Sequence, residues 1–556
     1  MAPRATRLEH MAIGRTSLAA LIAGGLTACP VENEGRPAPA SSAPFMLQMQ
    51  ASDAAPSPLL PPPPTLSLAS ASRATIGVRF EASRLFADTT YIPPDTMGAV
   101  GPRHIVEMIN GNFEVFDKTG RSVRSRSLAS FWTDIVGVAV QNGDVFDPRI
   151  VFDPASGRFF ATSIDRDYGA GNNVYLARSD TSDPTGDWDG FRFAPDTEGA
   201  VQFHDFDTLA IDADGVYICT DDFPDSSALT GLKSCYSIPK ADLVAALPTL
   251  ANMTRFEESP PELPSIWGSF QPALDFGSSD GRAPLLGVAF GTPSYLLRAN
   301  IFDAGAAGAT LGDAETILGD PGHRVWGGAR QPPPSTGRNW SIESRIGVLP
   351  GNVVQQGDSL WAAHTVQGSA SNAAVRWYEI DEPTNTLLQT GLIDDPLQDF
   401  IYPSIAVNAL GQVVIGYTCS GPSLAASSCV SVGETQAGVT EFDPPLLLRL
   451  GAGYYYQDYG TGRNRWGDFS ATVIDPADPC AFWTFQEFVA EAAHGLVGPP
   501  PLSGGGRWGT AITELRFVSC WQPPVEFSRN WHCGLGPELA FLMPLLFGTR
   551  RARRLR

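Results

Sequence analysis

Short apolar runs separated by turn residues recur along the body of the chain. The stretch "FDPRIVFDPASGRFFATS", residues 146–163, has an apolar run, a turn with Asp and Gly, and a second, more aromatic run. A related stretch, "FDTLAIDADGVYICTDD", covers residues 206–222. Two such runs around a tight turn predict a β-hairpin, so we expect strands on both sides of each turn.

The pattern recurs in seven units. Clear further copies begin at Tyr402 and Asp468, and weaker copies begin at Pro94, Phe270 and Ser344. Each unit leaves room for two more strands, and four-stranded units at such a period are typical of β-propeller blades. The small residues of the first runs suit inner strands near an axis, and the aromatic second runs suit packing between blades.

The pattern therefore predicts an all-β fold, a single β-propeller over residues 75–520. We expect seven four-stranded blades, with six as the alternative. The run "TIGVRF", residues 75–80, is expected to pair with "TAITELRF", residues 510–517, and to complete the last blade. Such closure removes the exposed edges of the ring.

The composition agrees with this class and limits the partners. Gly (56) and Pro (47) are frequent among the 556 residues, which favours short strands and tight turns. Since 43% of the residues are apolar, the chain can bury a large core. The formal net charge is −21, and a phosphate backbone requires a basic surface, so we expect no nucleic-acid partner.

The N-terminus predicts export and a lipid anchor. Arg residues precede a short apolar stretch, so residues 1–28 are expected to form a signal peptide. The sequence Leu26-Thr27-Ala28-Cys29 resembles the lipobox of bacterial lipoproteins, which implies an acylated Cys29 and attachment to a membrane. Pro30 follows Cys29, which by the rule of that family implies the outer membrane. Residues 29–74 are otherwise rich in Pro, Ala and Ser and are expected to act as an extended spacer.

The C-terminus predicts a second processing signal. After a short linker, residues 521–532, the tail 533–556 has Cys533, a short apolar run and a cluster of Arg residues. It resembles the MYXO-CTERM type of sorting tail of Gram-negative surface proteins, which implies recognition by export and sorting machinery. A weak C-terminal membrane anchor is the alternative. Both interpretations place the body outside the cytoplasm, at the outer membrane or cell surface.

The other six cysteines predict disulfides. We expect the sequence-local pairs Cys219–Cys235, Cys419–Cys429 and Cys480–Cys520, although six cysteines allow fifteen pairings. Disulfides are typical of an oxidising compartment. The cysteines and histidines have no metal-ligand spacing, and no cofactor is expected other than a possible Ca²⁺ among aspartates.

Several stretches together resemble a family of secreted bacterial β-propellers, similar in fold to the sialidase-like superfamily. They are "PPDTMGAVGPRHIVEMINGNFEVFDKTG", "ARSDTSDPTGDWDGFRF", "AAVRWYEI" and "RWGDFSATVIDPADPCAFWTFQEF". The resemblance covers about residues 80–520 and implies fold and export, but no established reaction. The chain has no S-x-D-x-G-x-x-W box of true sialidases; the nearest stretch, "SDPTGDW" at 182–188, is expected to form a turn.

Candidate ligand-binding residues come directly before the inner strands, because these strands begin at one mouth of a propeller channel. Carboxylates there suit acid–base chemistry, a cation or sugar hydroxyls, and arginines suit a carboxylate-bearing sugar. The alternative for each is that it satisfies backbone donors at a strand start. The candidates are Asp95, Asp147, Arg149, His204, Asp205, Asp207, Gln271, Arg345, Tyr402, Arg465, Trp466 and Asp468.

The second acidic or amide residue of each unit has a different prediction. Asp153, Asp212, Asn408 and Asp475 follow the first apolar run, where Asp and Asn stabilise turns through their own side chains. We expect these four to be structural.

Two functions remain from the sequence. The first is a non-catalytic surface propeller that binds an extracellular glycan or a surface protein. The second is a glycan-active hydrolase or lyase that uses carboxylates or arginines at the mouth. The chain has no nucleophile motif such as G-x-S-x-G, which favours the first.

Overall fold

A computed structural model describes residues 73–520, except 142–143, 166–171, 196–202, 224–231, 258–262, 265, 335–338, 345–346, 458–462 and 494–504. The signal peptide, Cys29, most of the spacer, the linker and the C-terminal tail lie outside these residues. No helix within the described part of the chain is long and apolar enough to cross a membrane.

The described strands form antiparallel meanders, which we number along the chain. Meander 1 contains β2 (Met97–Val100), β3 (His104–Ile109), β4 (Asn112–Asp117) and β5 (Ser122–Ser127). Meander 2 contains β6 (Val145–Asp153), β7 (Arg158–Asp165), β8 (Val174–Ser179) and β9 (Trp188–Phe193). Meander 3 contains β10 (Phe203–Ile211), β11 (Gly215–Phe223), β12 (Leu232–Pro239) and β13 (Thr254–Phe256). Short helical turns follow meander 1, α1 (Leu128–Ser130) and η1 (Phe131–Ile135), and α2 (Lys240–Val244) precedes β13.

The second half of the chain continues the pattern. Meander 4 contains β14 (Ile266–Asp275), β15 (Arg282–Ala289), β16 (Leu296–Phe302), β17 (Thr310–Leu311) and β18 (Glu315–Thr316). Meander 5 contains β19 (Val353–Gln356), β20 (Ser359–Gln367), β21 (Ala373–Asp381) and β22 (Thr386–Ile393). Meander 6 contains β23 (Asp399–Val407), β24 (Gln412–Gly421), β25 (Leu424–Gln436), β26 (Val439–Phe442) and β27 (Leu446–Arg449). Meander 7 contains β28 (Ala471–Asp475), β29 (Asp478–Glu491), β30 (Arg507–Phe517) and β1 (Ala74–Arg84), and η2 (Val518–Cys520) comes after it.

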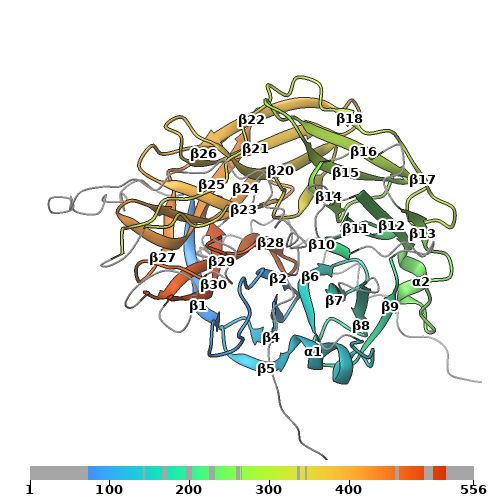
Figure 1. Cartoon of the computed structure of the whole chain (residues 1–556). Helices are drawn as coiled ribbons and strands as arrows, with labels where there is room; N and C mark the ends of the chain where they lie inside the picture. The colour runs from blue at the N-terminus through green and yellow to red at the C-terminus, as the bar shows by residue number, and fades with distance from the viewer. Residues whose placement is uncertain are drawn as a thin grey trace, which may run out of the picture. The chain divides into compact units, whose positions relative to one another are not determined.

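The meanders surround one axis as a β-propeller. Figure 1 shows the first strands β2, β6, β10, β14, β23 and β28 near the centre, with the later strands of each meander toward the periphery. The first strands of meanders 4 and 5, β14 and β19, also pair in parallel, so these two meanders share one nine-stranded sheet. Among the described strands the meanders therefore number seven and the hydrogen-bonded sheets six. The propeller class is confirmed. The number of blades is seven if meanders 4 and 5 are counted separately and six if their shared sheet is counted as one.

The ring closes through its two ends, as the sequence predicts. β1 pairs antiparallel with β30, with Ala74 opposite Phe517 and Phe80 opposite Ile512. The N-terminal strand thus becomes the outer strand of meander 7. All three expected disulfides form: Cys219–Cys235, Cys419–Cys429 and Cys480–Cys520.

The core lies between neighbouring meanders. The aromatic residues of the second strands are buried there, each with at most 3% exposed surface. They are Phe159, Phe160, Tyr217, Trp361, Tyr417, Trp483 and Phe485. Burial of these aromatic side chains stabilises the packing of adjacent sheets.

The two ends of the axis differ. We call the end where the innermost strands begin the mouth end and the other the base end. The described residues of two irregular segments lie against each other at the mouth end: Glu343 N donates to Asn464 O (2.9 Å) and Gln331 Nε2 donates to Tyr455 O (2.9 Å). These residues are 318–334, 339–344 and 347 of the first segment and 450–457 and 463–470 of the second. Their apolar residues pack with Ile109, Tyr402 and Trp508 at the mouth-end tips of strands.

Candidate functional site

The innermost strands share a backbone irregularity at the mouth end. Six residues at their starts have positive φ angles: Asp95, Asp147, Phe206, Gly268, Gly347 and Tyr402, between 49° and 67°. The strand pairing of β6, β10, β14 and β23 shifts register at the same place, which is a β-bulge. Left-handed backbone favours Gly and is tolerated by Asp, so the bulge gives a structural reason for Asp at positions 95 and 147.

The bulge also aims polar groups of three meanders at one another. Asp468 N donates to Asp95 Oδ1 (2.7 Å), and Asn110 Nδ2 donates to Asp95 Oδ2 (2.6 Å). Asn110 Oδ1 in turn accepts from Asp147 N (2.7 Å). All four residues are buried. Meanders 1, 2 and 7 are therefore joined at the axis through the Asp95 carboxylate.

These carboxyl groups form what we call the axial acid cluster: Asp95, Asp147, Asp205, Asp207 and Asp468. Burial raises the pKa of Asp147 well above its usual range, and the charges on Asp95, Asp205, Asp468 and Asp207 add to the rise. Burial and the Asp468 charge also raise the pKa of Asp95 to about 7, against hydrogen bonding from the Asp147 side chain. A raised pKa favours the protonated form of Asp147, which can donate a hydrogen bond to Asp95.

Arg149 lies on the axis below the cluster and is fully buried. Its guanidinium stacks on the Phe469 ring, 3.5 Å from the ring centroid, and its Nε donates to Asp207 O (2.8 Å). NH1 approaches Pro350 O (3.4 Å), so the side chain touches meanders 2, 3 and 7 and the segment before β19. Burial lowers the pKa of Arg149 to about 10, against the charges on Asp207, Asp147 and Asp95, and the group stays cationic at neutral pH.

Meander 3 contributes Asp207, whose backbone carbonyl accepts the hydrogen bond from Arg149. Burial raises the pKa of Asp207 to about 7, although the Arg149 charge and a hydrogen bond from Thr162 oppose the rise. Asp205, two residues earlier, is half-buried. His204 points instead toward β11, where its Nδ1 lies 2.6 Å from Asp222 Oδ1.

Arg465 joins the cluster to the mouth-end segments. Its NH2 donates to Asp468 Oδ2 (3.2 Å), and its Nε lies 3.5 Å from Glu343 Oε2. Burial lowers the pKa of Arg465, but the charges on Asp468, Glu343 and Asp95 outweigh it and the pKa rises. Tyr402 OH donates to Glu343 O (3.1 Å). The side chains of Arg465 and Glu343 keep 19% and 16% of their surface exposed, so charged groups of the site reach solvent here.

The remaining sequence candidates lie apart from the cluster or outside the described residues. Trp466 is buried, donates to Thr418 Oγ1 (3.1 Å) and packs edge-on against Tyr455, so it offers no open aromatic face. Gln271 Nε2 donates to Leu349 O (2.9 Å) and links meanders 4 and 5. Arg345 lies outside the described residues.

The second Asp or Asn of each unit lies at the base end and bonds to its own turn. Asp153 accepts from Ala155 N (3.1 Å), Asp212 from Gly215 N (2.7 Å), Asn408 from Leu410 N (3.0 Å) and Asp475 from Ala477 N (2.9 Å). These bonds agree with the turn role expected from the sequence.

Sequence reasoning missed three residues of the site. Asn110 lies in a hairpin turn and Glu343 lies in an irregular segment, and no periodic sequence pattern indicates either residue. Phe469 is part of an apolar run, which predicts a core residue. Among the described residues, no group of three or more His, Cys, Asp or Glu side chains has an arrangement that could hold a metal ion. The Ca²⁺ that the sequence analysis gives as possible stays untested.

No protein-family model and no curated protein matches the chain. Among solved structures, the sialidase of Trypanosoma rangeli aligns with 79% of this chain and 59% of its own, at 11% identity and a TM-score of 0.35. A subtype N10 neuraminidase-like protein from A/little yellow-shouldered bat aligns with 65% of this chain and 100% of its own, at 7% identity and a TM-score of 0.35.

The GH93 alpha-L-arabinofuranosidase of Fusarium graminearum aligns with 64% of this chain and 98% of its own, at 8% identity and a TM-score of 0.35. The aligned part thus spans less than two thirds of the trypanosomal sialidase. At these identities the likeness extends to no substrate or reaction, and the propeller assignment rests on the sheets of the chain itself.

Proposed function

We propose that the protein is a cell-surface propeller that binds a hydroxyl-rich glycan at the axial acid cluster without cleaving it. The observation that carries the proposal is the convergence of acids from meanders 1, 2, 3 and 7 at one end of the axis. Carboxylates accept hydrogen bonds from sugar hydroxyls, and the partly exposed Arg465 and Glu343 supply a donor and an acceptor at the rim.

The hydrogen bonds of Asp95 favour binding over catalysis. One carboxylate oxygen accepts from Asp468 N and the other from Asn110 Nδ2. A nucleophile or general base needs a free oxygen aimed at the reacting atom. Asp95 is thus a positioning group that fixes three meanders, and the ligand contacts fall to Asp205, Arg465 and Glu343.

The hydrolase is the second candidate because burial and neighbouring carboxylates raise the pKa of Asp147 well above its usual range. A glycosidase needs one carboxyl group that stays protonated and a second that is ionised. The raised pKa of Asp147 fits the first role, and Asp468, bonded to the Arg465 cation, fits the second.

A glycan array read for both retention and product release distinguishes the two. We expect the full chain to retain a glycan without releasing product, and Asp205→Asn to weaken binding about tenfold or more, as expected for the loss of a hydrogen bond to a charged group. Asp313→Asn, at an exposed position on meander 4, is the matched control and should bind like the wild type.

Product release that Asp147→Asn abolishes would establish the hydrolase instead. If Asp147→Asn, Asp205→Asn and Asp468→Asn fold and leave both retention and release unchanged, the axial acid cluster is not the site.

The surface location belongs to the same proposal. Three disulfides within the described residues fit an oxidising compartment. Export through residues 1–28, acylation of Cys29 and sorting through residues 533–556 would place the propeller at the outer membrane, with the Pro-rich spacer between the membrane and the propeller.

A further inference from the structure

The base end of the axis holds a cavity of about 290 Å³. It lies opposite the acid cluster, beyond the buried Arg149 side chain. Its lining comes from the ends of innermost strands of six meanders and is mainly apolar, and it includes Val100, Phe152, Leu274, Val354, Val407 and Val473. Phe276 also lines it, although half of its surface is exposed to solvent. A mainly apolar hollow lined by aromatic side chains is typical of a binding site.

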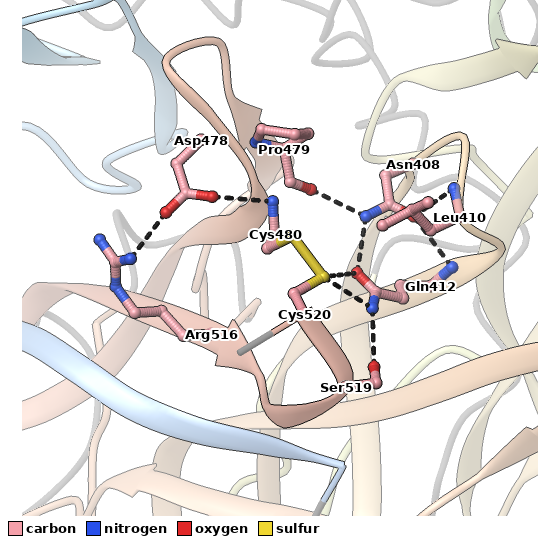
Figure 2. The surroundings of a disulfide bond; sticks show 9 residues. All are labelled: Asn408, Leu410, Gln412, Asp478, Pro479, Cys480, Arg516, Ser519 and Cys520. Atoms are coloured by element: carbon pink, nitrogen blue, oxygen red, sulfur yellow. Dashed lines mark hydrogen bonds and ion pairs between the residues drawn. A yellow bond between two sulfur atoms is a disulfide. The ribbon is translucent and has the colours of Figure 1, made fainter. Parts of the chain in front are cut away.

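The rim of this cavity is bonded to the last described residues of the chain. Asn408 and Pro479 both line the cavity, and Asn408 Nδ2 donates to Pro479 O (2.8 Å) and to Gln412 Oε1 (2.7 Å). Gln412 Nε2 donates in turn to Ser519 Oγ (3.0 Å). Figure 2 shows this chain of contacts running from the cavity rim to Ser519 and Cys520.

A disulfide fixes the same place covalently. Cys480 directly follows the lining residue Pro479, and its bond to Cys520 holds the two Cα atoms 5.9 Å apart (Figure 2). Cys520 is the last described residue, so the rest of the chain continues from a point that is fixed against Cys480. The chain beyond residue 520 therefore starts at the rim of the cavity.

The segment that begins there is apolar and suited to such a hollow. Residues 521–527 read "WQPPVEF", with an aromatic residue at each end and two prolines between them. Proline has no backbone donor to leave unsatisfied, and a Pro-rich segment loses little conformational freedom when it binds. A short tether gives its effective concentration at the rim an order of magnitude of mM, so weak contacts suffice for occupancy.

We propose that residues 521–527 dock in cis into the base-end cavity, with Trp521 as the anchor and the Cys480–Cys520 disulfide as the tether. The cavity is the receptor for this segment of its own chain, and the contact fixes where the sequence leaves the propeller toward residues 528–556. The proposal does not depend on glycan binding, which concerns the other end of the axis.

Photo-crosslinking of the full chain tests it. A benzophenone amino acid replaces Trp521, and the crosslinked peptides are identified by mass spectrometry after irradiation. We expect crosslinks to peptides that contain Phe276, Val354 or Val473. The same amino acid in place of Leu247, which is 88% exposed on another part of the propeller, is the control and should give none to these peptides.

Two further variants test the docking in case the benzophenone amino acid itself disturbs the cavity. The double variant Cys480→Ser, Cys520→Ser removes the disulfide, which leaves the segment held only through the end of β30, and should lower the crosslink yield several-fold. The variant Trp521→Ala, Phe527→Ala should empty the cavity and raise binding of an apolar fluorescent dye several-fold, while folding is checked by circular dichroism. Crosslinks outside the cavity lining, or dye binding equal to that of the wild type, would overturn the proposal.

Discussion

Glu107 gives a quantitative test of the polar core between meanders 7 and 1. This β3 residue has 1% of its surface exposed, and its Oε2 accepts from Ser83 Oγ of β1 (2.5 Å). Burial raises its pKa from 4.5 to about 7, against hydrogen bonds from Ser83 and Thr510. The folded state therefore holds this proton more tightly than the unfolded state does.

The size and sign of the effect are set by that shift. Below about pH 4.5 the carboxyl is protonated in both states, and its contribution to the free energy of unfolding is fully present. As the pH rises through about 7, the folded state must ionise a buried group and this contribution is lost. One pKa unit corresponds to about 1.4 kcal/mol, so the loss is about 3 kcal/mol.

The variant Glu107→Gln removes the ionisation and keeps the shape. We expect its free energy of unfolding to fall less than that of the wild type between about pH 4 and about pH 8, by about 3 kcal/mol. Any constant cost of burying the Gln amide cancels in this difference. Urea unfolding with intact disulfides, at fixed ionic strength, measures it.

Glu315→Gln, at an exposed position on β18, is the matched control and should keep the pH dependence of the wild type. If Glu107→Gln loses as much stability with rising pH as the wild type, the buried carboxyl is already ionised at low pH and the argument from burial is wrong.

Two other outcomes are expected. Arg149→Met keeps contact with Phe469 but removes the cation that lowers the pKa of Asp207, so the pKa of Asp207 should rise further above its usual range. We expect the free energy of unfolding of this variant to be lower than that of the wild type by about 3–5 kcal/mol at about pH 8, and by much less at about pH 4. Equal losses at both pH values in urea unfolding would contradict this. Mass spectrometry of protein from the membranes of producing cells should find acyl chains on Cys29, and Cys29→Ser should move the protein to the soluble fraction; an unmodified Cys29 would refute the lipobox interpretation.

The fold could be predicted because its determinants are local in sequence. Each hairpin is encoded by its own alternation of apolar runs and turn residues, and the same order recurs at Asp153, Asp212, Asn408 and Asp475. The closing strand could be predicted because an unpaired β-like run precedes the first unit, and β1 indeed pairs with β30. The parallel pairing of β14 with β19 could not, because it depends on the spacing of two blades around the axis.

The candidate site was predictable only by position along each unit. Strand starts place Asp95, Asp147 and Asp468 at one end of the axis, and they do meet there. Their partner Asn110 comes from a hairpin turn, and Glu343 comes from a segment without periodicity. Contacts of this kind depend on tertiary structure and leave no local signal.

The two aspartates that flank one apolar run, Asp147 and Asp153, have different structural roles. At the base end the Asp153 side chain bonds to its own turn and forms an ion pair with Lys240 (3.0 Å), so its carboxylate is fully used by the scaffold. At the mouth end the Asp147 backbone takes the left-handed conformation of the bulge, which would also accept Gly. Gly could not supply the carboxyl group, whose pKa is raised by burial and by acids of three other meanders. Asp147→Gly should therefore preserve the bulge and remove the acid, which separates the scaffold role of this position from its chemistry more cleanly than any change at Asp153.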